Sequence, residues 1–135
     1  MATFSKRSLD NLKDCHVDLQ TIFNRVIKDF DCVVICGYRN EKDQNTAFES
    51  KLSKLRYPGS KHNKIPAMAA DVLPYPISWT DKERMYFFAG YVIAISKVLL
   101  NEGKITHSVK WGGDWDSDTE VKDQTFFDLP HFELI

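Results

Sequence analysis

The stretch LQTIFNRVIKDFDCVVICG, residues 19–37, holds the two patterns that decide the fold class. Its apolar residues fall at offsets of 0, 3, 4, 7, 8 and 11 from Leu19, ending at Phe30, which is the spacing of one helix face. Asp31 breaks this pattern, and a β-branched run over residues 32–36 follows. A short run of this kind is typical of a buried strand. The stretch therefore predicts a helix that leads directly into a strand of a sheet.

Beyond this stretch, helix and strand patterns continue without a strict strand–helix–strand order. Thr80 and Glu83 have capping-box spacing, and apolar residues behind them form two stripes over residues 85–99, which predicts a central, buried helix. Further helices are expected over residues 9–13 and 41–51, strands over 69–73, 105–111 and 131–135, and loops over 52–66 and 114–123. We therefore predict an α+β fold in which a small, mostly antiparallel sheet packs with helices.

The composition is that of an ordinary globular domain. The chain has 135 residues, 43% of them hydrophobic, and 18 basic against 19 acidic residues, so its formal charge is −1. This balance excludes a disordered tail, a collagen-like fibre and a polycationic nucleic-acid binder. A chain of this length is sufficient for one core, so residues 1–135 are predicted to form a single domain. We expect a monomer with no nucleic-acid partner.

Cysteine usage and the apolar runs bear on compartment. Cys15, Cys32 and Cys36 lack CxxC spacing, and we expect free thiols in a reducing environment. The first 14 residues contain no apolar signal segment. The longest apolar run, residues 85–100, is shorter than the ~20 residues of a membrane span, so no membrane insertion is expected.

Two pairs of histidine and aspartate stand out as candidates for chemistry. His62 lies in the aperiodic loop, and Asp71 lies inside an apolar segment, where a carboxylate is costly to bury without a partner. Asp128 and His131 form a second pair near the C-terminus. Two imidazoles and one carboxylate are a common ligand set for catalytic zinc, and a further carboxylate can take a proton from water. An Asp71 that only accepts backbone hydrogen bonds is the alternative.

At this point the motifs carry a family resemblance. Ser60-x-His62, Ala70-Asp71 and Asp128-x-x-His131 are similar to the metal segments of the zinc D-Ala-D-Ala carboxypeptidase and dipeptidase superfamily. Gly37-Tyr38-Arg39 followed by Gln44, and Trp111-Gly-Gly-Asp-Trp115, extend the similarity to nearly the whole chain. Within the superfamily, the chain most resembles the bacteriophage endolysins that cleave the L-alanyl-D-glutamate bond of peptidoglycan.

The resemblance implies a role for each matching residue. His62, Asp71 and His131 would bind one zinc ion per chain, Asp128 would be the general base, and Arg39 would stabilise the oxyanion. Because residues three apart face opposite sides of a regular strand, an irregular segment must bring Asp128 and His131 together. Four further residues are expected near the substrate: Ser60, Gln44, Trp111 and Trp115. For Ser60 a turn, and for the two tryptophans core packing, are open alternatives.

Several alternatives stay open at the level of sequence. The superfamily also contains D-Ala-D-Ala carboxypeptidases and dipeptidases, and a non-catalytic, zinc-stabilised cell-wall-binding module would have the same fold. Such a module would be closed by a fourth protein ligand, and no cysteine or histidine is close enough in sequence to suggest one. The roles of His16, His107 and Glu133 are undecided, and the acidic residues 114–120 lack the spacing of a calcium-binding EF-hand loop. The endolysin interpretation implies an enzyme held in the host cytoplasm until a membrane pore releases it to the cell wall.

Overall fold

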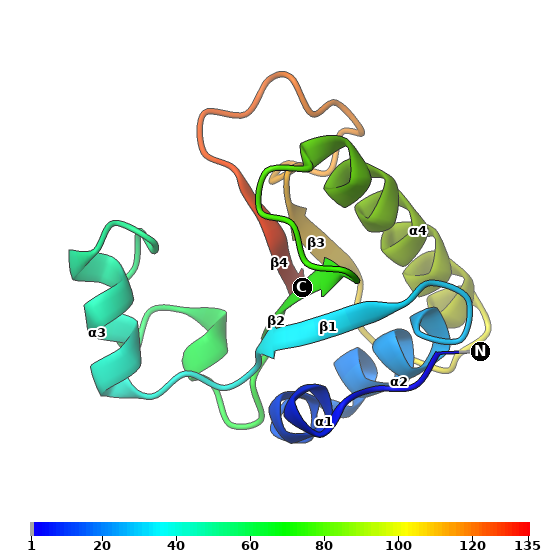
Figure 1. Cartoon of the computed structure of the whole chain (residues 1–135), viewed down its shortest axis with the longest axis horizontal. Helices are drawn as coiled ribbons and strands as arrows, with labels where there is room; N and C mark the ends of the chain where they lie inside the picture. The colour runs from blue at the N-terminus through cyan, green and yellow to red at the C-terminus, as the bar shows by residue number, and fades with distance from the viewer. Residues whose placement is uncertain (1) are drawn as a thin grey trace.

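A four-stranded antiparallel sheet with helices packed against it forms the architecture of residues 2–135 in the computed structural model (Figure 1). The helices are α1 (Lys6–Leu12), α2 (Val17–Val26), α3 (Glu41–Glu49), the 3-10 helix η1 (Lys61–Asn63) and α4 (Lys82–Asn101). The strands are β1 (Cys32–Cys36), β2 (Ala69–Pro74), β3 (Val109–Gly112) and β4 (Asp128–Leu134). Their order in the sheet is β1-β2-β4-β3. The predicted α+β class with an antiparallel sheet is confirmed.

The register of the sheet brings distant segments of the chain together. Asp71 in the central strand β2 pairs with Cys36 of β1 on one side and with His131 of β4 on the other. The register shifts between β3 and β4. Trp111 of β3 pairs with Phe132, but the next residue, Gly112, pairs with Asp128. Extra residues on one strand kink it and redirect its side chains. This shift is the irregular segment that the sequence required between Asp128 and His131.

Helices α2 and α4 cover one face of the sheet and enclose the core. The apolar face of α2 that the sequence predicted is buried, and Phe23 packs edge to face against Phe132 of β4 at 5.6 Å between ring centroids. Phe88 of α4 contacts the same ring at 6.2 Å. Figure 1 shows α3 apart from α1, α2 and α4, beyond the end of β1. The end of the sheet near α3 therefore carries less helical cover than the rest.

The helix predicted over residues 85–99 is present as α4, but the prediction that it is buried was wrong for one of its two apolar faces. One face of α4 is buried, but Phe87 and Val98 on the other are 71% and 52% exposed. The helix packs on the sheet with a single face, so its second apolar stripe meets solvent. Its N-cap is Asp81, whose side chain accepts from the Arg84 amide, rather than Thr80.

Other boundaries differ from the sequence expectations by a few residues. The helix expected to reach Phe30 ends at Val26, and the strand expected from residue 105 begins at Val109. The three cysteines are free thiols, as predicted. Within residues 2–135, no helix has both the length and the apolar character that a membrane crossing requires.

Candidate active site

His62, Asp71 and His131, here called the triad, meet at the end of the sheet near α3. Their ligating atoms form a nearly equilateral triangle: His62 Nε2 lies 3.2 Å from His131 Nδ1 and 3.3 Å from Asp71 Oδ1, and His131 Nδ1 lies 3.4 Å from Asp71 Oδ1. Each comes from a different element, η1, β2 and β4. All three residues are buried. Segments 69 residues apart in sequence thus supply one compact polar cluster.

The outer nitrogen of each imidazole is fixed by a hydrogen bond. His62 Nδ1 lies 2.8 Å from the Gly37 carbonyl oxygen, which can only accept, so Nδ1 carries the proton. His131 Nε2 lies 2.8 Å from Glu133 Oε1 and donates to that carboxylate. In the neutral rings, the unprotonated nitrogens therefore point into the triangle, toward Asp71 Oδ1. That oxygen is buried and has no hydrogen-bond partner.

Three acceptors facing one point require a positive charge between them. A tetrahedral zinc ion with bonds of about 2.0 Å spaces its ligand atoms about 3.3 Å apart, which is the size of this triangle. The pKa values of His62 and His131 also indicate that this site favours positive charge. Burial disfavours the charged imidazoles, yet the Asp71 carboxylate raises the pKa of His62 to about 10 and contributes to raising that of His131 to about 9. The residues present fit a bound metal cation.

Arg39 and Gln44 support the triad from the side of α3. Arg39 donates to Asp71 Oδ2 at 3.4 Å and to Gln44 Oε1 at 3.0 Å, so it engages the carboxylate oxygen that faces away from the imidazoles. Gln44 is fully buried, and its amide nitrogen donates to Ser53 Oγ at 2.9 Å and to the Leu55 carbonyl at 2.6 Å. With its polar atoms engaged in this way, Gln44 orients Arg39 rather than facing a substrate.

Asp128 stands farther from the triad than its members stand from each other. Its Oδ2 lies 3.8 Å from His131 Nδ1, and its side chain is 32% exposed. Burial, and after it the nearby Asp71 carboxylate, raise the pKa of Asp128 to about 6. A carboxyl group that titrates near neutrality beside a metal site can both accept and return a proton.

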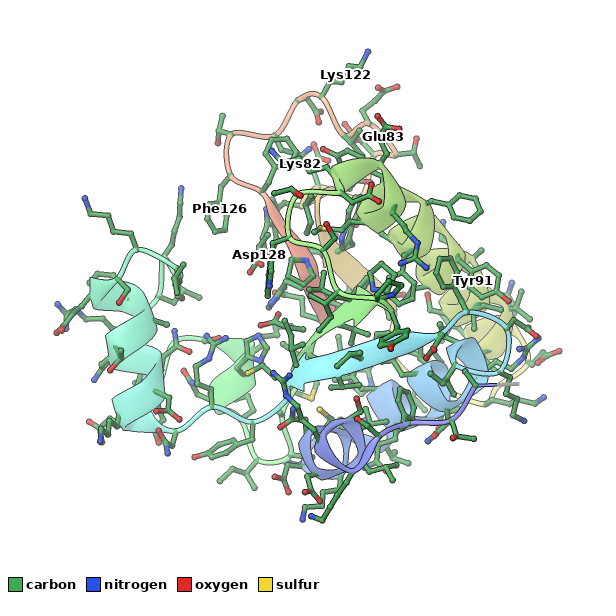
Figure 2. The ribbon with its side chains drawn as sticks, viewed as in Figure 1. Lys82, Glu83, Tyr91, Lys122, Phe126 and Asp128 are labelled. Atoms are coloured by element: carbon green, nitrogen blue, oxygen red, sulfur yellow. The ribbon has the colours of Figure 1, made fainter. Side chains whose placement is uncertain are left out.

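A cavity of about 780 Å³ opens over the triad and is lined by Arg39 and Asp128 as well. Its walls come mainly from Arg39, from the segment between α3 and η1, and from the segment that precedes β4. Figure 2 shows Phe126 and Asp128 on the side of that segment and of β4 that faces α3. The volume is within the range of pockets that bind small molecules or short peptides.

A family model described as "Phage L-alanyl-D-glutamate peptidase" matches residues 1–135. The chain belongs to this peptidase family. Among solved structures, it is similar to the crystal structure of the Serratia marcescens L-Ala D-Glu endopeptidase ChiX, with a TM-score of 0.68 and 23% sequence identity. That similarity covers 98% of this chain and 89% of the other, and it confirms the fold. A search of curated proteins found no match.

Three other residues were predicted to lie near the substrate: Trp115, Trp111 and Ser60. Two of them line the cavity and one does not. Trp115 lines the cavity, where its ring tilts against that of His131 at 5.5 Å between centroids. Trp111 is buried in the core, packs edge to face on Tyr86 at 5.8 Å and does not line the cavity. Ser60 accepts a hydrogen bond from the His62 amide and caps η1, so it holds His62 in place. Ser60 also lines the cavity.

Sequence reasoning missed one neighbour of the triad and left another undecided. Cys36 Sγ lies 3.9 Å from His62 Nδ1, on the side of the ring that faces away from Asp71 Oδ1. No sequence pattern indicates this contact, because the thiol reaches the site through the pairing of Cys36 with Asp71 in the sheet. Glu133 was undecided, although it lies two residues from His131 on the same strand face, and this spacing is the signal for its contact.

Proposed function

We propose that the chain is a zinc-dependent peptidase that hydrolyses the L-alanyl-D-glutamate bond of bacterial peptidoglycan as a phage lysis enzyme. The observation that carries this proposal is the triangle formed by two imidazole nitrogens and the buried, unpartnered Asp71 Oδ1, whose corners lie 3.2–3.4 Å apart and whose three residues line a cavity. Membership of the L-alanyl-D-glutamate peptidase family supports the choice of bond.

One zinc ion per chain would be held by His62, Asp71 and His131. Bound there, zinc supplies Lewis acidity toward a carbonyl oxygen and lowers the pKa of water. Three protein ligands leave one side free for substrate and water, as catalytic sites require. The Gly37 carbonyl and the Glu133 carboxylate each bind the outer N–H of one ring, so the inner nitrogens, His62 Nε2 and His131 Nδ1, are the ones that would lose their protons and bind the ion.

Asp128 is the group that moves the proton. Water attacks the carbonyl carbon of the scissile bond while Asp128 accepts one of its protons, and the carbonyl carbon becomes tetrahedral. Asp128 then returns the proton to the nitrogen as the C–N bond breaks, so the products are a carboxylic acid and an amine. Its raised pKa, about 6, suits both halves of this transfer.

Arg39 acts on the oxygen of the same carbonyl. Its guanidinium lines the cavity, and Gln44 and Asp71 hold it there through hydrogen bonds. A guanidinium has five N–H donors, so it retains donors for the developing oxyanion. Because its position is fixed before substrate arrives, little reorganisation accompanies the reaction.

The working partners are the peptide stems of peptidoglycan. We propose that the chain acts as a monomer and is held in the host cytoplasm until a membrane pore gives it access to the wall. The alternatives are D-Ala-D-Ala cleavage, which releases D-alanine or its dipeptide, and non-catalytic wall binding, which releases nothing.

Mass spectrometry of digested peptidoglycan tests the proposal. Purified wall is incubated with zinc-loaded protein, with protein treated with a chelator, and with chelated protein to which zinc is restored. New N-terminal D-glutamate, lost on chelation and regained with zinc, is the expected result. Release of D-alanine would show that the protein is a carboxypeptidase rather than an endopeptidase. Cleavage that survives complete metal removal would contradict the zinc mechanism.

A further inference from the structure

Besides the triad histidines, the cavity is lined by three lysine or arginine side chains, of which two are already engaged. Arg39 pairs with Asp71 Oδ2, as described above. Lys61 Nζ lies 3.8 Å from Glu133 Oε2 and donates to the Leu134 carbonyl. Lys54 forms no salt bridge with any acidic residue between positions 2 and 135, although it too lines the cavity. Among the lysine and arginine side chains of the cavity, it is therefore the one without an ion pair to any residue in the described part of the chain.

An aromatic contact directs Lys54 across the cavity. Its Nζ lies 4.6 Å from the ring centroid of Phe126, in the segment before β4, whereas Lys54 itself follows α3. The Phe126 ring stacks on Trp115 at 6.0 Å and 20°, and Trp115 Nε1 donates to the Phe126 carbonyl at 2.8 Å. Trp115 in turn packs on His131. Figure 2 shows Phe126 projecting on the same side as Asp128. The ammonium is thus placed on the wall that leads to the triad.

The proposed substrate has an anion on the amine side of the scissile bond. A glutamyl residue whose nitrogen is acylated by alanine has two carboxyl groups, and the peptide can continue through only one of them. The other is a free carboxylate unless it is amidated. Resting on the proposed function, we infer that Lys54 binds this free carboxylate and makes the peptidase prefer glutamyl over amidated glutamyl stems.

The contacts of the three cations favour Lys54 for this role. Turning Arg39 to a substrate carboxylate would weaken its contact with Asp71, and turning Lys61 would uncouple it from Glu133. Lys54 gives up no ion pair. A face-on aromatic contact leaves the N–H donors on the other side of the ammonium free to bind an oxygen.

Cleavage of two matched synthetic peptides tests the inference. They contain the L-alanyl-D-glutamyl bond and differ only in whether the free carboxyl group is a carboxylate or a carboxamide. Because Lys54 is exposed to solvent, we expect the zinc-loaded protein to favour the carboxylate by about fivefold in kcat/KM, the upper end for an exposed ion pair. Lys54→Met should remove this preference, chiefly by slowing the carboxylate peptide, and Lys54→Arg should restore most of it.

Lys42→Met is the matched control, because Lys42 is an exposed lysine on α3 that does not line the cavity. It should retain the full preference. Equal cleavage of both peptides by the unmodified protein overturns the inference while leaving the proposed function intact. An equal loss on both peptides in Lys54→Met also overturns it, since Lys54 would then only join the two cavity walls. If neither peptide is cut, the proposed function itself fails.

Discussion

Residues 2–135 contain two clusters of two histidines and one aspartate, and of these two only one has the properties expected of a metal site. The first is the triad of the cavity. The second, here called the α2 cluster, lies at the N-terminus of α2 and consists of His16, Asp18 and His107. The residue types are identical, and in each cluster the aspartate is almost fully buried. Because residue type and burial of the aspartate match, some other property must distinguish the two clusters.

In the α2 cluster, one oxygen of the aspartate already has four donors. Asp18 Oδ2 accepts from the Thr106 amide at 2.9 Å, from the Thr106 hydroxyl at 3.0 Å, and from the amide and ring Nδ1 of His107 at 3.1 and 2.7 Å. His16 Nδ1 accepts from the Asp18 amide at 2.9 Å and so caps α2. The cluster is complete without a cation.

The difference teaches that the hydrogen-bond state of such residues distinguishes a candidate metal site from a structural cluster better than their composition does. In the triad, the hydrogen bonds to Gly37 and Glu133 turn the unprotonated nitrogens inward, toward an oxygen without a donor. In the α2 cluster, the donors turn inward instead. They also tie residues 106–107 to α2, and the regular strand begins only after them, at Val109.

The largest expected effect comes from removing the aspartate of each cluster in turn. Asp71→Ala should lose most of the bound zinc and with it the activity, because three acceptors are reduced to two. Asp18→Ala should retain about one zinc per chain, although it destabilises the fold. Zinc content after dialysis, measured by atomic emission, gives the answer, and His62→Ala and His131→Ala should follow Asp71→Ala. Full zinc occupancy in all three triad variants would refute the ligand assignment.

Asp128→Asn should separate proton transfer from metal binding. It preserves the shape of the side chain and removes its basicity, so turnover should fall at least ~100-fold while zinc content stays unchanged. Steady-state cleavage of a synthetic L-alanyl-D-glutamyl peptide measures the loss. If turnover stays near that of the unmodified protein, the base lies elsewhere, and Glu133 becomes the next residue to test.

Arg39→Ala should reduce kcat with little change in KM, because a donor to the oxyanion acts mainly in the tetrahedral state. The expected cost is about 3 kcal/mol, or roughly 100-fold in rate. Arg39→Lys should recover only part of it, since an ammonium keeps the charge without the planar fork. Zinc content is measured as a control, because Arg39 contacts the proposed zinc ligand Asp71. A loss confined to KM would instead place Arg39 on a substrate carboxylate and favour a carboxypeptidase.

The local parts of the fold were readable from the sequence because their causes are local. The six apolar positions from Leu19 to Phe30 define a helix face by spacing alone, and the strand Cys32–Cys36 was predicted at its observed bounds. The second stripe of α4 misled because burial depends on what packs against a helix. Phe87 and Val98 have the right spacing for a buried face, but no element covers them fully.

The site was readable only in part, for a related reason. The structure brings together the five residues that the family resemblance proposed for chemistry: His62, Asp71, His131, Asp128 and Arg39. Their convergence depends on sheet register, which single-residue patterns do not encode. The positions of Gln44 behind Arg39, and of Trp111 in the core, depend on tertiary packing in the same way.

Asp18→Asn should affect stability rather than zinc. Burial opposes ionisation of Asp18, but hydrogen bonds from His107 and Thr106 lower its pKa below the ordinary value. A lowered pKa means that the carboxylate stabilises the fold above the unfolded-state value of about 3.9, and that this contribution is lost as the pH falls through the folded-state value. We expect a loss of about 2 kcal/mol at pH 7 by urea unfolding, and a weaker acid dependence below pH ~4. Equal acid dependence in both proteins would contradict the assignment.

Glu133→Gln is the finest test of the comparison, because a carboxylate binds one histidine ring at each cluster. At the triad it is the neighbouring Glu133, and in the α2 cluster it is Asp18. His131 Nε2 lies 2.8 Å from Glu133, and His107 Nδ1 lies 2.7 Å from Asp18, but only the other nitrogen of His131 faces further ligands. Gln keeps an acceptor and loses the charge that makes the ring more basic, so zinc affinity should fall about tenfold, the lower end for such contacts. Competition with a chromogenic chelator measures it, and Glu102→Gln on the exposed end of α4 should change nothing. Unchanged affinity combined with slower turnover would move Glu133 from orienting a ligand to the chemistry itself.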